Sequence, residues 1–252
     1  MPNDLPIYLP IYLPRYFKEL RDWLKTDLGE YLLKQEAKVI SDILNNCFNK
    51  NILILGEPEF GVIVDNLQHI LIHPELLIAH NNINTIYVAA RQDKLPIDSN
   101  SIDIIILAHA LEMLPNPYEM LRESYRVLRP EGKIIITGFA VNSFWHVWKL
   151  FAKLFYRAPW RNMFIAPHRL IDWLSVLGLE EFKIIKYCYN LPINNKKILN
   201  KLWLIEKIGS ILPFKMGNLY MISAKKKVIW LTPVFANKLA EEDLNNNLAK
   251  IT

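Results

Sequence analysis

The residues of this chain that are best suited to chemistry lie where apolar strands are predicted to end. His109 follows the apolar run 102–108, and Glu112 comes three residues later. Ligands of open parallel sheets bind at the carboxyl ends of the strands, so an imidazole there could contact a ligand or act as a general base near neutral pH. The alternative is a histidine that only hydrogen-bonds backbone at the strand end, and both interpretations stay open.

A second candidate is the turn after the apolar run 51–55, which reads Gly56-Glu57-Pro58-Glu59-Phe60-Gly61. A glycine lets the backbone approach a bound ligand closely, whereas Pro58 removes an N–H donor and Phe60 adds bulk. This turn is therefore a poorer cradle for a ligand than a glycine-rich loop. Its alternative is a plain turn from a strand to a helix.

Apolar runs that alternate with helical segments indicate the elements that must position these residues. Parallel strands are predicted at 51–55, 69–73, 85–90, 102–108 and 133–139. The clearest helix begins at Pro117 and is stopped by Pro130, with an inner face made of Met120, Leu121, Ser124, Tyr125 and Leu128. Further helices are predicted at 168–177 and 196–212, and further strands at 182–189 and 219–224. Such alternation predicts a parallel sheet that is covered by helices.

The segment before the first strand has a different character. Residues 7–14 repeat the sequence Ile-Tyr-Leu-Pro, which predicts an extended arm, and helical spacing between 16 and 48 predicts two helices that break near Gly29. We therefore divide the chain into residues 1–50 (arm and helices), 51–230 (the sheet domain) and 231–252 (a tail). Within the domain, residues 141–166 form an aromatic and basic insertion with the composition of a lid.

Composition limits the classes of function. The 252 residues contain only two cysteines, Cys47 and Cys188, in no ligand-spaced cluster, which disfavours a disulfide framework and a metal site and fits a reduced, cytoplasmic protein. No apolar run reaches the roughly 18 residues of a membrane-spanning helix. The net charge of +5 allows an acidic partner, but a compositional bias toward Ile, Lys and Asn explains it better, and no arrangement typical of nucleic-acid binding is found. The sequence leaves the oligomeric state open.

The segment 95–139 carries a resemblance to a known family. It contains, in order and at matching spacing, the strings Leu95-Pro96-Ile97-Asp98-Ser99-Asn100-Ser101-Ile102-Asp103, His109-Ala110-Leu111-Glu112, Leu121-Arg122-Glu123 and Arg126-Val127-Leu128-Arg129-Pro130-Glu131-Gly132. This pattern resembles the type 11 group of class I S-adenosylmethionine-dependent methyltransferases. Residues 23–33, 143–145, 169–174 and 224–227 also look like a bacterial branch of that group. The resemblance implies an α/β, Rossmann-like sheet, mostly parallel with the last strand antiparallel, and helices on both faces.

The same resemblance implies a cofactor, S-adenosylmethionine, and the residues around it. They are Leu55, Gly56, Glu57, Glu75, Arg91, Gln92, Asp93, Leu95 and His109, with His109 also the catalytic candidate. Five positions depart from the family pattern: Pro58 and His146 each replace a glycine, Arg91 replaces an acidic residue, Ala140 replaces an asparagine, and Val141 replaces a proline.

Aromatic residues after the fifth strand indicate where the methyl acceptor would bind. Phe139, Trp145 and His146 are the candidate substrate contacts, and the acceptor they suggest is a small or lipid-like molecule. The aromatic and basic residues of 142–162 could also touch a lipid surface, or simply pack on the core. Two functions follow: an S-adenosylmethionine-dependent methyltransferase, or a relative that kept the sheet, lost the cofactor and serves in binding or regulation.

Overall fold

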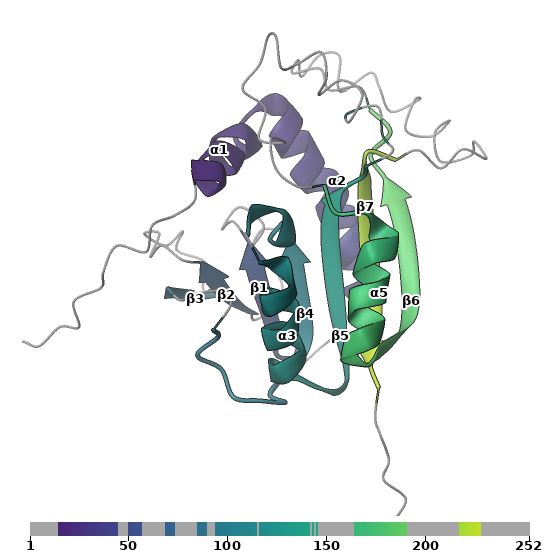
Figure 1. Cartoon of the computed structure of the whole chain (residues 1–252). Coiled ribbons are helices and arrows are strands. Elements are labelled where there is room, and N and C mark those ends of the chain that lie inside the picture. Colours follow the sequence, from purple (N-terminus) through teal and green to yellow (C-terminus); the bar gives the residue numbers. More distant parts are fainter. Residues whose placement is uncertain are drawn as a thin grey trace, which may run out of the picture.

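The computed structural model of the chain describes residues 15–44, 50–56, 69–73, 85–89, 94–114, 116–141, 143, 145, 164–190 and 217–227. Its centre is a seven-stranded sheet with the order β3-β2-β1-β4-β5-β7-β6 (Figure 1). The strands are β1 (Ile52–Gly56), β2 (His69–His73), β3 (Thr85–Ala89), β4 (Ile102–Ala108), β5 (Leu128–Phe139), β6 (Leu179–Tyr187) and β7 (Leu219–Lys226). Neighbouring strands are parallel except that β7 runs antiparallel to both β5 and β6. The predicted sheet, including its antiparallel last strand, is confirmed.

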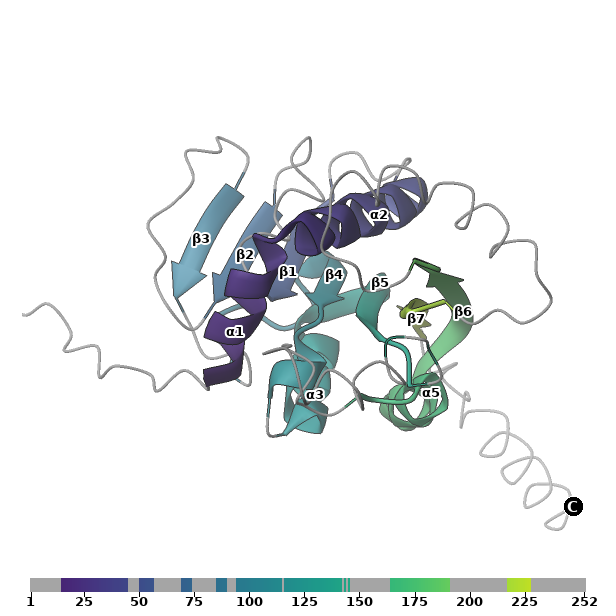
Figure 2. The ribbon, with the colours of Figure 1, turned by 90° about the horizontal axis from the view of Figure 1, so that it is seen from above.

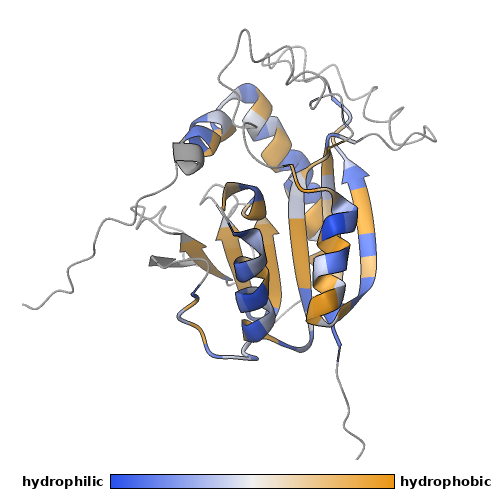
Figure 3. Ribbon diagram, in the orientation of Figure 1, coloured by the Kyte–Doolittle hydropathy of each residue, from blue (hydrophilic) through white to orange (hydrophobic). Residues whose placement is uncertain are grey.

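Helices cover both faces of the sheet, as predicted. The helices α1 (Arg15–Leu24) and α2 (Asp27–Leu44) pack on one face, and α3 (Pro117–Val127) and α5 (Pro167–Leu177) pack on the other (Figure 2). Alternate residues of β1 serve the two sides: Ile52 and Ile54 face α1 and α2, whereas Leu53 and Leu55 face α3 and α5. The hydropathy view shows the apolar strands at the centre and polar residues on the outer side of α3 (Figure 3). Burial on both faces explains why the central strands are continuous apolar runs.

The two N-terminal helices form as predicted, but the break lies at Lys25 and Thr26 rather than near Gly29. The Thr26 hydroxyl donates to the Trp23 carbonyl at 2.7 Å and accepts from the Gly29 N–H at 3.2 Å, which ends one helix and begins the next. Gly29 instead allows close packing, because a Cβ there would lie 2.4 Å from the Trp23 carbonyl oxygen. The glycine marks the contact between the helices and not the break.

The connection from α3 to β5 also differs from the prediction. The helix ends at Val127, before Pro130, and Leu128 already has the extended conformation and pairs with Ile102 of β4. The proline disfavours helical backbone at Arg129, so the chain leaves the helix early. Lys226 of β7 reaches this helix end, where its Nζ donates to the carbonyls of Tyr125 at 2.8 Å and Leu128 at 2.6 Å.

Several predictions lie outside the described residues: the turn after Gly56, the helix at 196–212 and most of the insertion at 141–166. The division of the chain into arm, domain and tail stays a prediction. No helix among the described residues is long and apolar enough to cross a membrane.

Candidate functional site

The candidate site lies where β1 and β4 end side by side. Gly56, the last residue of β1, pairs with Ala108 of β4, and His109 follows directly. Gly56 has a φ of +154°, and a Cβ at this position would lie 2.6 Å from the Ala108 carbonyl oxygen. Only glycine fits there without strain, so the end of β1 presents backbone rather than a side chain.

His109 is held between two carboxylates that come from different parts of the chain. Its Nδ1 lies 3.0 Å from Glu112 Oε2, and its Nε2 lies 3.6 Å from Oε2 of Glu36 on α2. Glu112 belongs to the short helix η2 (Leu111–Met113), and its other oxygen accepts the Phe139 N–H at 2.7 Å. The side chains of Glu36 and His109 are fully buried. We call these three residues, Glu36, His109 and Glu112, the His109 cluster.

In the His109 cluster, the neighbouring charges and the burial act on the pKa of His109 in opposite directions. Desolvation alone would lower the pKa of His109, but the charge of Glu36 and the hydrogen bond to Glu112 outweigh it and raise that pKa to about 10. Burial raises the pKa of Glu112, and the contacts to His109 and Phe139 offset part of that rise. His109 is therefore an imidazolium at neutral pH and holds no free lone pair with which to accept a proton.

Two tyrosines from the last strands border the His109 cluster. Burial raises the pKa of Tyr187 of β6 well above its usual value, and the neighbouring Glu36 adds to this. Burial and Glu112 do the same for Tyr220 of β7. A Cβ at Gly138 would lie 2.6 Å from the Tyr220 hydroxyl and 3.0 Å from Glu112 Oε1, so this glycine makes room for both groups.

Aromatic rings cover the His109 cluster on one side. The Phe139 ring lies 4.3 Å from the His109 ring, centroid to centroid, and about 6 Å from the rings of Trp23, Trp145 and Phe164. Trp145 is buried, and its indole N–H donates to the Asn190 carbonyl at 2.8 Å. Aromatic residues from the first helix and from the end of β5 thus meet in one layer.

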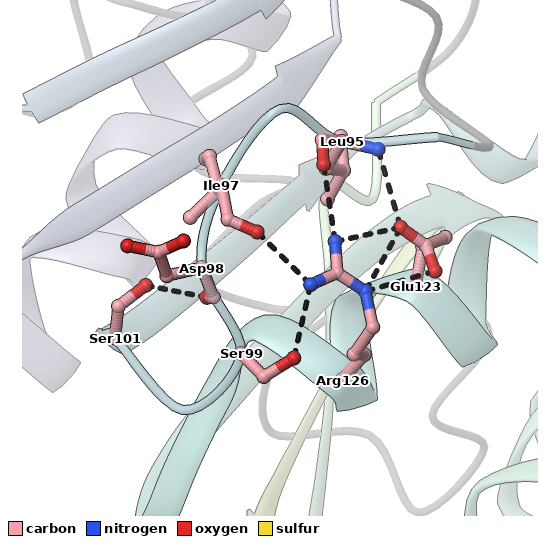
Figure 4. A network of polar contacts seen from close by, with 7 residues as sticks. All are labelled: Leu95, Ile97, Asp98, Ser99, Ser101, Glu123 and Arg126. Carbon is pink, nitrogen blue, oxygen red and sulfur yellow. Dashed lines mark hydrogen bonds and ion pairs between the residues drawn. The ribbon is translucent and has the colours of Figure 1, made fainter.

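A second polar centre holds the loop 94–101 against α3 (Figure 4). The Arg126 guanidinium donates to the carbonyls of Leu95 at 3.0 Å and Ile97 at 2.9 Å, and to the Ser99 hydroxyl at 3.1 Å. It also pairs with Glu123 at 2.9 Å, and Glu123 accepts the Leu95 N–H at 3.2 Å. The hydrogen bond from Arg126 lowers the pKa of Glu123. We call Arg126, Glu123 and the bonded loop residues the Arg126 clamp.

The structure brings together some of the predicted site residues. Gly56 and His109 meet at the strand ends, and Phe139 and Trp145 belong to the aromatic layer beside His109. The side chains of Leu55 and Leu95 are buried on the face of α3 and α5, and the backbone of Leu95 lies in the Arg126 clamp. The other predicted residues, Glu57, Glu75, Arg91, Gln92, Asp93 and His146, lie outside the described residues.

Sequence reasoning missed Glu36, although the sequence carried a signal for it. The buried stripe of α2 contains Leu28, Leu32, Glu36, Ile40 and Leu44, one residue every four. A carboxylate in the middle of such an apolar stripe must find a charged partner in the core. Within the described part of the chain, no group of three or more His, Cys, Asp or Glu side chains is arranged to hold a metal ion.

Comparisons with known proteins agree with this geometry. Residues 67–136 match the family model of the methyltransferase domain. The uncharacterized protein YafS of Escherichia coli K12 is 34% identical over 140 residues, which are 55% of this chain and 54% of that protein. The chloroplastic 2-methyl-6-phytyl-1,4-hydroquinone methyltransferase 1 of Oryza sativa subsp. japonica is 26% identical over 56% of this chain and 38% of its own length. The chain thus matches about half the length of these relatives, or less.

Solved structures share the fold. A protein of Thermotoga maritima, described as an S-adenosylmethionine-dependent methyltransferase and possible histamine N-methyltransferase, superposes with a TM-score of 0.61. The superposition covers 84% of this chain and 97% of that one at 18% identity. Identity at this level speaks for the fold alone.

Proposed function

We propose that this chain, which has the class I methyltransferase fold and matches the methyltransferase domain model over residues 67–136, transfers a methyl group from S-adenosylmethionine to a small or lipid-like acceptor. The observation that carries the proposal is the edge at which Gly56 and His109 meet, because ligands of such sheets bind at the carboxyl ends of the strands. The activity itself, the acceptor and the cytoplasmic location are proposals.

The described residues of the edge fit the cofactor. Gly56 places no side chain where backbone must approach the ligand. The cofactor is a sulfonium cation, and the His109 cluster carries one excess negative charge when both of its carboxylates are ionised. Gly56 and the loop that the Arg126 clamp fixes at Leu95 would hold the cofactor from two sides.

The chemistry asks the protein mainly for position. When bound, S-adenosylmethionine supplies an already activated methyl group. The chain would align the acceptor with that group and exclude water, and the layer of Phe139, Trp145 and Trp23 suits an apolar or flat acceptor. His109 is not suited to proton removal at neutral pH, because its pKa is raised to about 10, and its role as a catalytic residue stays a prediction.

A prenylated hydroquinone is the first acceptor to try, since one relative is named for a phytyl hydroquinone. Such a molecule combines a flat ring with an apolar tail, and both match an aromatic layer. The measurement is the release of S-adenosylhomocysteine when this acceptor and S-adenosylmethionine are supplied together.

Cofactor binding can be tested without an acceptor. We expect isothermal titration calorimetry to give a one-site heat with S-adenosylmethionine and with S-adenosylhomocysteine. ATP, which shares the adenosine but lacks the amino-acid part, is the control and should give no comparable heat. No heat and no thermal shift with either ligand at millimolar concentration would contradict the proposal.

That negative result would favour the second candidate, a binding or regulatory protein that has lost the cofactor. One structural observation supports it: His109 is fully buried between carboxylates with an aromatic ring against it, which is how a purely structural group would be packed. The sequence departures at Pro58 and Arg91 point the same way but lie outside the described residues.

A further inference from the structure

Glu36 is the unexplained charge of the N-terminal helices. It sits in the apolar stripe of α2, and its carboxylate is fully buried. Within the described part of the chain, neither of its oxygens has a hydrogen-bond partner, and its one ion pair there is with His109 Nε2 at 3.6 Å. A buried charge costs several kcal/mol unless it is compensated, so a protonated His109 favours the docking of α2 in this position.

The contact partner of Glu36 is His109, the residue that directly follows β4. His109 has a left-handed backbone with a φ of 51°, a conformation that is uncommon for residues other than glycine. Its N–H donates to Thr137 Oγ1 at 3.3 Å, its Nδ1 contacts Glu112, and Phe139 lies against its ring. These contacts fix the turn that follows Ala108, next to Gly56.

We propose that Glu36 is a positioning residue of the methyl-transfer site, which ties α2 to the end of β4 through His109 and so fixes the edge that receives the cofactor. This inference rests on the proposed function. Glu36 touches neither reacting atom and acts through His109. Docking of the N-terminal helices and assembly of the cofactor edge then become one event.

In the described part of the chain, the titratable groups around His109 come from four elements. Glu36 belongs to α2, Glu112 to η2, Tyr187 to β6 and Tyr220 to β7. The tyrosines are neutral at physiological pH, and the upward direction of their pKa values keeps them so. Of the cluster's two carboxylates, Glu112 also accepts the Phe139 N–H, so Glu36 is the one whose removal leaves the backbone of β5 untouched.

The first measurement is the titration of the His109 imidazole by nuclear magnetic resonance, assigned by comparison with His109→Asn. In the unaltered protein the imidazolium should persist to about pH 10. Glu36→Gln keeps the shape but removes the charge, and should move the titration down by about 1 to 3 pH units. Glu30→Gln, an exposed carboxylate of the same helix, should leave it unchanged.

The second measurement is the affinity for S-adenosylhomocysteine, by calorimetry on the full chain. Glu36→Gln should weaken it about 3- to 30-fold, and Glu30→Gln should not change it. Glu36→Asp keeps the charge and should recover part of both effects. If circular dichroism shows that Glu36→Gln does not fold, Glu36→Asp replaces it in both measurements.

The outcomes separate the two proposals. A His109 titration that Glu36→Gln leaves unmoved overturns the ion pair, and a moved titration with unchanged affinity overturns the positioning role alone. If the unaltered protein binds no S-adenosylhomocysteine, the proposed function fails and the positioning role fails with it.

Discussion

The Arg126 clamp and the His109 cluster both balance a cation against carboxylate, but they do so in opposite surroundings. In the clamp, Arg126 and Glu123 are partly exposed, bond to each other and also bond to the backbone of a nearby loop. In the cluster, the charges are buried and join α2, the end of β4 and η2. The clamp therefore stabilises a local motif, whereas the cluster joins segments that are far apart in sequence. The ion pair of the clamp is partly hydrated, whereas the ion pairs of the cluster are strong because water is excluded from them.

Their pH responses should also be opposite. The pKa of Glu123 is lowered in the folded protein, so the stability it contributes is present above its usual value of 4.5 and is lost as the pH falls. The pKa of His109 is raised from 6.5 to about 10, so its contribution is complete below pH 6.5 and is lost as the pH rises toward 10. Acid should weaken the clamp and alkali the cluster.

The largest effect is expected from Glu112→Ala. The substitution leaves the buried His109 with one carboxylate fewer and the Phe139 N–H without its acceptor, so the free energy of unfolding should fall by about 3 to 5 kcal/mol. Urea unfolding measures it. Glu119→Ala, an exposed carboxylate on α3, is the control, and an equal loss in both variants would show that burial of the pair is not the cause.

The next effect is the alkaline dependence of stability. Between pH 6.5 and about 10, the free energy of unfolding should fall with a slope of up to about 1.4 kcal/mol per pH unit, because the unfolded chain releases the His109 proton first. Urea unfolding at a series of pH values checks this against His109→Asn, which tolerates the left-handed backbone. Parallel curves for the two proteins would rule out His109 as the source of the slope.

A smaller effect is expected from Arg126→Ala. The loop 94–101 loses its bonds at Leu95, Ile97 and Ser99, but water can replace a half-exposed guanidinium, so the loss should be about 1 to 2 kcal/mol. Hydrogen exchange should report faster opening of this loop. Arg122→Ala, exposed on the same helix, should change neither quantity.

The smallest effect is the acid response of the clamp. Glu123→Gln should flatten the decline of stability below pH 4.5 and leave the alkaline limb unchanged, because the lowered pKa belongs to that carboxyl group. Thermal unfolding at pH 3 to 7 measures it. A change on the alkaline side instead would mean that the two centres are coupled.

Much of the fold was accessible from sequence because its signals are local. Apolar runs of strand length, the helix that begins at Pro117 and the motif from Leu95 to Gly132 predicted the sheet and its helices. The Arg126 clamp shows why that motif speaks for fold, since its loop residues and Glu123 and Arg126 hold one another. The errors were local too: the start of α2 and the end of α3 were displaced because capping and strand pairing decided them.

The candidate site was only partly accessible. Gly56 and Phe139 could be chosen because each ends an apolar strand, and His109 because it directly follows one. Glu36, the partner of His109 on α2, could not be predicted from the sequence, because nothing near either residue specifies a contact between positions 73 residues apart.

The sequence by itself determined the order of strands and helices along the chain and the motif that holds the loop 94–101 on α3. Both follow from periodicity and from neighbours along the chain. Only the tertiary structure decided the charge of His109. The pKa of an imidazole depends on which carboxylates folding places against it and on how much water folding removes. For His109, folding brings Glu36 against the ring, and the aromatic layer helps to exclude water.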